Sequence, residues 1–138
     1  PDPRMQATVA RPDALFDPAY PINHGRAPGR GTAMARYAGD VYFSGGAYYF
    51  STLGAAEFCF CAAALAGGND ARHWFERGAA SPATVRAHTP ADGGLSEQFD
   101  QRSGAQTSAK QLAWSYAAFI SCVWARRIAA AGQAPRQQ

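Results

Sequence analysis

Residues 92–116, DGGLSEQFDQRSGAQTSAKQLAWSY, are the most informative stretch of the chain. One glutamate, Glu97, stands between a glycine-containing turn at 92–94 and a second turn-like run at 101–104, and a helical pattern begins near Ser108. Glycine, serine and aspartate are typical turn residues, so we expect Glu97 to lie in a loop. Loops carry a large share of catalytic groups, which makes this carboxylate a candidate catalytic residue.

Working outward, helices separated by long loops are predicted for the rest of the chain. Residues 3–16 are predicted to form a helix that ends before the next proline. The glycine-, proline- and tyrosine-rich residues 19–47 are predicted to form a long ordered loop, a kind of segment that is often functional. Residues 48–66 carry apolar side chains at three- and four-residue steps, which predicts a helix that ends at the glycines of 67–69.

Three further helices are predicted in the C-terminal half. Two are short, at 70–79 and 82–88, and the last runs from about 108 to 131. Residues 132–138 are expected to be a disordered tail, which leaves 1–131 as the folded part. The core-facing stripe of the last helix is predicted to consist of Leu112, Tyr116, Phe119 and Val123.

The charge of the chain argues against nucleic acid as a partner. The formal net charge is +3, and of the 13 basic residues only Lys110 is a lysine. The arginines are scattered, and only Arg126 and Arg127 are adjacent. Nucleic-acid-binding proteins usually gather such residues on one face, so no nucleic-acid interface is predicted.

Two apolar runs, 47–66 and 111–130, have about the 20-residue length that can cross a bilayer. The first contains Glu57, and the second contains Arg126 and Arg127 near its end. Both runs also keep amphipathic stripes, which suit packing inside a globular protein, so no membrane partner is predicted.

The cysteines do not suggest a metal or a disulfide. Cys59 and Cys61 are two positions apart in a helical pattern, so their side chains point in different directions, and Cys122 stands alone in another helix. No histidine lies at metal-ligand spacing from them. We expect all three to be small buried hydrophobic residues, and we predict neither a metal nor an organic cofactor.

Four blocks of sequence, taken together, are far more specific than a single short motif. In chain order they are YPIN at 20–23, ARYAGDVYF at 35–43, STLGAAE at 51–57, and the stretch 92–116 with its Ser-Glu-Gln and Trp-Ser-Tyr runs. This set resembles the C-terminal catalytic segment of the glucoamylases, the inverting glycoside hydrolases of family 15.

The resemblance implies an all-α fold, the (α/α)6 barrel, in which helical hairpins form a double ring. Glucoamylase catalytic domains are several times longer than 138 residues. The chain is therefore expected to supply the final helices and loops of an incomplete barrel and to leave an apolar edge open. The missing N-terminal part of the same domain is the expected partner, and the chain alone is expected to be inactive.

The resemblance also assigns catalytic roles. Glu97 matches the general base, which must be ionised to take a proton from water. Ser108 matches a serine whose hydroxyl donates to that base. An alternative role for Ser108 is the N-cap of the last helix, because serine is common there.

Four further residues match substrate-binding positions. Arg36 and Asp40 match residues that contact substrate sugars, although a salt bridge within the loop is the alternative. Trp114 matches a tryptophan that lies against the sugar at the cleavage site, with a core tryptophan as the alternative. Tyr48 stands where the family has a tryptophan near the subsite for the leaving sugar.

The chain departs from the family pattern on the leaving-group side. Ala38-Gly39 replaces Pro-Glu, and Gly46-Ala47-Tyr48 replaces Asn-Pro-Trp. These changes leave open whether the bond cleaved is α-1,4 as in starch, α-1,6 as in dextran, or the linkage of trehalose.

The general acid is expected to lie in an earlier segment of the family's domain. Glu57 is interpreted as a buried polar partner of a neighbouring loop, and Asp100 as a turn former. His24, His73 and His88 are predicted to face solvent, each on its own. None of these residues is expected to replace the acid.

The sequence therefore predicts part of an inverting hydrolase. Its expected substrate is starch or malto-oligosaccharides, from whose non-reducing ends it would release β-glucose. Two alternatives remain: a related family 15 hydrolase of α-1,6-glucans or trehalose, and a non-catalytic helical module that binds glycans or a protein, with a vestigial site. The sequence does not indicate a compartment.

Overall fold

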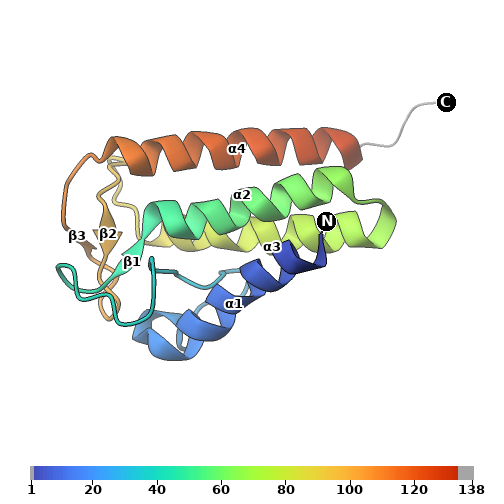
Figure 1. The fold of residues 1–138 in the computed structure, drawn as a ribbon. Helices are drawn as coiled ribbons and strands as arrows, with labels where there is room; N and C mark the ends of the chain where they lie inside the picture. The colour runs from blue at the N-terminus through green and yellow to red at the C-terminus, as the bar shows by residue number, and fades with distance from the viewer. Residues whose placement is uncertain (1, 134–138) are drawn as a thin grey trace.

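The structure is a computed structural model that describes residues 2–133, and within them it is mainly helical (Figure 1). The longer elements are the helices α1 (Pro3–Ala19), α2 (Tyr49–Leu65), α3 (Gly68–Ala87) and α4 (Ala113–Gln133). A short 3₁₀ helix, η1 (Pro21–Asn23), follows α1. The all-α prediction is confirmed as the dominant character of the chain.

Three two-residue strands form a small antiparallel sheet at one end of the helices (Figure 1). They are β1 (Ala47–Tyr48), β2 (Gln98–Phe99) and β3 (Gln106–Thr107), and β2 lies between the other two. The sheet joins the end of the long loop, at β1, to the hairpin that carries the candidate base.

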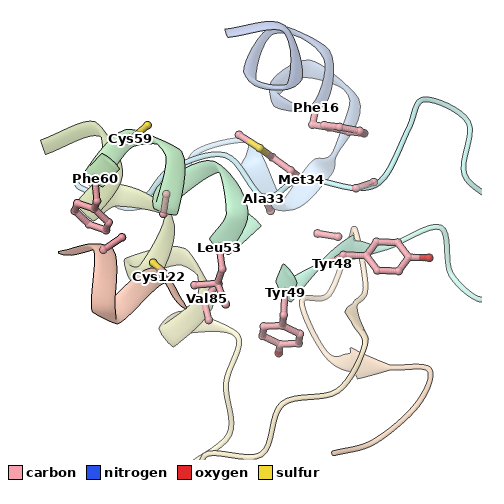
Figure 2. Close-up of a cluster of buried hydrophobic side chains, with 14 of the residues drawn as sticks. Phe16, Ala33, Met34, Tyr48, Tyr49, Leu53, Cys59, Phe60, Val85 and Cys122 are labelled. Carbon is pink, nitrogen blue, oxygen red and sulfur yellow. The ribbon is translucent and has the colours of Figure 1, made fainter. Parts of the chain in front are cut away.

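The helix α2 is the centre of the fold, with α3 and α4 packed on either side of it (Figure 1). It is rich in alanine and buries Leu53 and Phe60 completely. Figure 2 shows these side chains beside Val85 of α3 and Cys122 of α4, with Phe16 of α1 on the far side. Burial of large apolar side chains of this kind stabilises a fold by roughly 1.5–3 kcal/mol each.

The first helix is longer than predicted. We expected it to end at residue 16, but α1 continues through Asp17 and Pro18 to Ala19. A proline removes only its own N–H, and the last turn is still closed because Tyr20 N–H donates to the Phe16 carbonyl. Packing of Phe16 against the Tyr20 ring, 5.3 Å away, favours the same conformation.

The prediction of two short helices over 70–88 is wrong, because α3 is continuous through Pro82. The long loop makes hydrogen bonds to the neighbouring turn of α3 at this point. Gly31 N–H donates to the Ala80 carbonyl at 2.9 Å, and the Thr84 hydroxyl donates to the Gly31 carbonyl at 2.7 Å. These bonds connect the long loop to α3 on either side of Pro82.

The last helix differs from the prediction in its start and in its buried face. It begins at Ala113, not at 108, and it includes Gly132 and Gln133, while 134–138 lie outside the described residues. The predicted stripe is right for Tyr116, which packs against the core, and wrong for Phe119, which is 45% exposed. The residues that α4 buries are smaller: Ser115, Cys122, Ala125 and Ala129.

The cysteine prediction holds for two of the three residues. Cys59 and Cys122 are buried, whereas Cys61 is exposed on α2, and all three thiols are free. Burial raises the pKa of the Cys59 and Cys122 thiols to about 11, which keeps them protonated and unreactive at neutral pH.

Within 2–133, none of the helices combines the length and apolar character needed to cross a membrane.

Candidate functional site

The candidate site residues gather at the end of the molecule where the small sheet lies (Figure 1). Arg36 and Asp40 belong to the loop before β1, and Glu97 immediately precedes β2. Ser108 follows β3, and Trp114 lies in the first turn of α4. Segments far apart in sequence therefore meet at one edge of the fold.

The backbone around Glu97 is held on both sides by the segment that leads into α4. Glu97 N–H donates to the Ala109 carbonyl at 2.8 Å, and Leu112 N–H donates to the Leu95 carbonyl at 3.0 Å. The buried hydroxyl of Ser115 donates to the Ser96 carbonyl at 2.7 Å. Glu97 is thus a half-buried side chain on a rigid backbone, the arrangement that a positioned catalytic group needs.

Ser108 directs its hydroxyl at the glutamate. Its Oγ donates a hydrogen bond to Glu97 Oε2. The alternative role as an N-cap is excluded, because α4 begins five residues later. Ser108 also has a φ of 67°, a left-handed backbone conformation that is uncommon for residues other than glycine. Such conformations are often found at functional sites.

Gln98, the neighbour of Glu97, fixes the long loop against the hairpin. It is completely buried, and its Oε1 accepts a hydrogen bond from Gly46 N–H at 3.0 Å. Its Nε2 donates to the Tyr42 carbonyl at 3.1 Å and to the Tyr48 hydroxyl at 2.9 Å. One side chain therefore places the loop of Arg36 next to the segment of Glu97.

Arg36 and Asp40 form the salt bridge that we considered as an alternative for this pair. Two hydrogen bonds join them, from Nε to Oδ2 at 2.8 Å and from NH2 to Oδ1 at 3.0 Å. The Arg36 guanidinium, with the Tyr42 N–H as a further donor, holds the pKa of the Asp40 carboxyl below its usual value. The Asp40 side chain is fully buried while that of Arg36 is 35% exposed, so only the arginine remains open to a substrate.

Tyr48 does not occupy the position that we predicted. The whole residue is buried, so it offers no face to a leaving sugar. Instead the guanidinium carbon of Arg36 lies over the Tyr48 ring, 4.7 Å from its centroid. The Tyr48 hydroxyl accepts a hydrogen bond from Gln98 Nε2. Burial first, and then the negative charge of Asp40, raise the pKa of the Tyr48 phenol. Tyr48 is a support for Arg36 in this structure.

Trp114 is not a core residue, which was the alternative for it. Its side chain is 61% exposed, and one face of the indole stacks on Phe50 at 4.5 Å with an interplanar angle of 9°. Phe50 in turn contacts the Tyr48 ring, 5.1 Å away. These contacts connect Trp114 to Arg36 and leave the other face of an indole open, as stacking against a sugar ring would require.

Three further polar residues that we considered differ in their surroundings. Asp100 is a turn former as predicted, because its Oδ1 accepts from the N–H groups of Arg102 and Ser103, which lower its pKa. Glu57 is half-buried on α2, about 12 Å along the helix from its first residue at a rise of 1.5 Å per residue. The solvent-facing prediction for His88 is wrong, since its ring stacks on Phe99.

This geometry defines a class of protein. It is a mainly helical protein whose loops bring a serine-bound glutamate, an exposed arginine and an exposed tryptophan to one edge of the fold. The sequence comparison specifies the family. The model of "Glycosyl hydrolases family 15" matches residues 1–124, so the chain belongs to glycoside hydrolase family 15.

Individual relatives agree with this assignment. The chain is similar to a glucoamylase of Neurospora crassa, at 35% identity over 77% of this chain and 22% of the relative. It is also similar to glucoamylase P of Amorphotheca resinae, at 35% identity over 87% of this chain and 25% of the relative. The chain thus spans about a quarter of the length of these relatives.

Solved structures show the same fold. The glucoamylase of Hormoconis resinae matches with a TM-score of 0.78 and 29% identity, over 87% of this chain and 27% of that structure. The family 15 glucoamylase of Hypocrea jecorina matches with a TM-score of 0.80 and 24% identity, over 99% of this chain and 30% of that structure. The prediction that the chain forms part of an (α/α)6 barrel is confirmed.

Sequence reasoning missed the residues that support the site. Gln98, Ser115 and Phe50 are all within or beside motifs that we quoted, but no local pattern distinguishes a buried glutamine from an exposed one. Gly46 was noted only as a departure from the family pattern. An added Cβ there would lie 2.4 Å from the Phe99 carbonyl oxygen, so the close approach of β1 to β2 requires glycine.

Proposed function

We propose that the chain is the C-terminal part of an inverting glycoside hydrolase that releases β-glucose from the non-reducing ends of α-1,4-glucans such as starch. The observation that carries this proposal is the pair formed by Glu97 and Ser108, fixed by backbone hydrogen bonds at the edge of a family 15 fold. The two relatives described above are glucoamylases, which supports the same substrate class.

Glu97 is the proposed general base. In an inverting hydrolase one carboxylate takes a proton from water while a second carboxyl group, about 6.5–9.5 Å away, protonates the leaving oxygen. The hydroxyl of Ser108 fixes one carboxylate oxygen of Glu97 and leaves the other free to accept from water. The proton donor is proposed to lie in the three quarters of the domain that this chain does not cover.

Arg36 and Trp114 are the proposed contacts with sugar. Arg36 offers the N–H groups that Asp40 does not use, and the open face of Trp114 suits the C–H surface of a glucose ring. Asp40 and Tyr48 act behind Arg36 by fixing its charge and its orientation. Neither a metal nor an organic cofactor is needed for this chemistry.

The remaining part of the same domain is the proposed partner of α4. This helix exposes a row of large apolar side chains, although soluble proteins seldom leave such patches uncovered. They are Trp114 (61% exposed), Ile120 (66%), Trp124 (63%) and Ile128 (51%). Further helices of the barrel would cover the C-terminal part of this face and leave Trp114 at the rim of the site.

The anomer of the product tests the proposed reaction. In the full-length protein, hydrolysis of maltose is expected to release the glucose of the non-reducing end as the β-anomer, because water attacks from the face opposite the leaving group. Proton NMR of the anomeric region during the first minutes distinguishes β- from α-glucose. Maltose, isomaltose and trehalose compared at equal concentration give the linkage preference. The reducing-end glucose of maltose carries both anomers already, so an initial excess of α-glucose over that mixture is the result that would overturn the inverting mechanism.

Substitution of Ser108 tests its role beside the base. Ser108→Ala is expected to lower kcat on maltose by about 10-fold with little change in KM, since one hydrogen bond to a charged group contributes roughly 1.5 kcal/mol. Ser108→Gly is the matched variant, because it removes the hydroxyl and also relaxes the left-handed backbone. Both variants should lose activity equally, and full activity in either would show that the hydroxyl is dispensable.

A non-catalytic glycan- or protein-binding module remains the second candidate. The open aromatic and arginine side chains would serve binding equally well. Substitution of the proposed base, described in the Discussion, separates the two functions, because binding does not require an ionised Glu97.

A further inference from the structure

The peptide group between Ser96 and Glu97 is held at both of its polar ends. Its carbonyl accepts a hydrogen bond from the Ser115 hydroxyl at 2.7 Å, and its N–H donates to the Ala109 carbonyl at 2.8 Å. A peptide group is planar, so bonds at its two opposite edges fix the orientation of the whole plane. That orientation sets the direction in which the side chain of Glu97 leaves the backbone.

The two bonds differ in what a substitution can remove. The bond to Ala109 joins two backbone groups, whereas the bond to Ser115 depends on a side chain. Ser115 is 0% exposed and Ser96 is 1% exposed, so bulk water does not reach this second bond. Within residues 2–133, the Ser96 carbonyl has no other hydrogen-bond donor. Loss of the Ser115 hydroxyl would therefore leave a buried carbonyl unpaired and the peptide plane held at one edge only.

Ser115 also lies beside the proposed sugar contact. It belongs to the first turn of α4 and directly follows Trp114, whose indole stacks on Phe50. The next residue, Tyr116, accepts a hydrogen bond from the Leu95 N–H at its hydroxyl, at 3.0 Å. One turn of helix thus carries the open indole and fixes the loop of the proposed base.

We propose that Ser115 is a positioning residue, whose hydroxyl orients the peptide group before Glu97 and so aligns its carboxylate with a sugar stacked on Trp114. Ser115 does not touch the substrate, because it is completely buried. Its effect on the rate comes through Glu97, since a misplacement of about 1 Å can lower a rate by about 100-fold. This inference rests on the proposed function, because it needs Glu97 as the base.

Alanine at this position removes the hydroxyl and little else. In the full-length protein, Ser115→Ala is expected to lower kcat on maltose by about 10-fold or more, with less than about a twofold change in KM. KM should change little because Arg36 and Trp114, the proposed contacts with sugar, keep their places.

Thr84→Val is the matched control for a loss of stability alone. The Thr84 hydroxyl of α3 is also buried, and it donates to a backbone carbonyl, that of Gly31, at 2.7 Å. Thr84→Val should lower the melting temperature about as much as Ser115→Ala does, because each removes one buried hydroxyl donor. Its kcat should stay at the wild-type value.

A second variant and a second readout address the hydroxyl and the loop directly. Ser115→Thr keeps a hydroxyl donor and should retain more activity than Ser115→Ala. Hydrogen exchange of the Leu95 and Glu97 amides should be faster in Ser115→Ala than in wild type and unchanged in Thr84→Val, because only the first substitution loosens this loop. The exchange measurement does not need activity, and it also serves if the extra methyl of threonine does not fit.

A double substitution shows whether Ser115 acts through the base. In a Glu97→Gln background, Ser115→Ala should change the residual kcat by less than about twofold, because no base remains to be positioned. An equal fall in both backgrounds, of about 10-fold or more, would overturn the inference, since Ser115 would then act on the site by another route.

The outcomes separate this inference from the proposed function. Wild-type kcat in Ser115→Ala, or an equal fall of kcat in Thr84→Val, would overturn the role of Ser115 and leave Glu97 as the proposed base. Unchanged exchange of the Leu95 and Glu97 amides in Ser115→Ala would do the same. Full activity of Glu97→Gln would instead remove the proposed function, and the inference with it.

Discussion

Substitution of Glu97 by glutamine is expected to lower kcat on maltose by about 10²–10⁴-fold in the full-length protein, the range that general-base catalysis contributes. The amide has nearly the same shape as the carboxylate but cannot take a proton from water. The backbone bond from Glu97 to Ala109 does not involve the side chain, so the loop should keep its conformation. Initial rates of glucose release, with KM measured in parallel, check this expectation.

The matched control is Glu57→Gln. It removes a carboxylate of the same type from the middle of α2, away from the end where the small sheet lies. Activity close to wild type is expected, which would show that the loss in Glu97→Gln is specific to the site. Undiminished hydrolysis by Glu97→Gln would exclude Glu97 as the base.

Substitution of Gly46 by alanine is expected to produce the largest loss of stability. The new Cβ would lie 2.4 Å from the Phe99 carbonyl oxygen and 3.1 Å from Gln98 Oε1, and the first of these is a backbone atom of β2 that cannot move alone. Separation of the strands would also break the bond from Gly46 N–H to Gln98, whose polar side chain is fully buried. Overpacking and an unsatisfied buried group together cost about 3–5 kcal/mol.

Thermal unfolding of the full-length protein measures this effect, with an expected fall in melting temperature of about 6 °C or more. Gly54→Ala is the matched control, because Gly54 is exposed in the interior of α2 and an added Cβ there meets no atom within 4 Å. That variant should be unchanged or stabilised by about 0.5–1 kcal/mol, since alanine favours a helix more than glycine does. Equal stability of Gly46→Ala and wild type would contradict the close contact of β1 and β2.

Helices with strong periodicity were predicted well. The helix predicted at 48–66 is observed as Tyr49–Leu65, and the long loop before it is confirmed apart from η1 and β1. Residues 3–16 and 70–88 were predicted less well because prolines mark helix ends only as a local tendency. At Pro18 the Tyr20 N–H closes the last turn, and at Pro82 the long loop bonds to the neighbouring turn of α3, a contact that no local pattern encodes.

The site was predicted in part. The hydrogen bond between Ser108 and Glu97 agrees with the resemblance to the family, while their catalytic roles stay predictions. Trp114 is exposed, as a sugar contact must be, and Arg36 keeps an open edge. Tyr48 was misplaced because its exposure depends on the loop that folds over it. His88 was misread for the same reason, since its partner Phe99 lies 11 positions further along the chain.

The sequence by itself determined the family and the helical character. The order of four motif blocks specified glycoside hydrolase family 15, and the family match over residues 1–124 confirms it. Side-chain periodicity was sufficient for the helices because a helix repeats every 3.6 residues within a short window.

Only the tertiary structure decided which polar side chains are buried and which remain open. Gln98 bonds to Gly46 and Tyr48 across about 50 positions of sequence, and these bonds set the loop of Arg36 beside Glu97. A buried polar group is tolerated only when partners satisfy it, and those partners come from distant segments. The arrangement of the site is therefore a consequence of packing between segments that no local sequence pattern specifies.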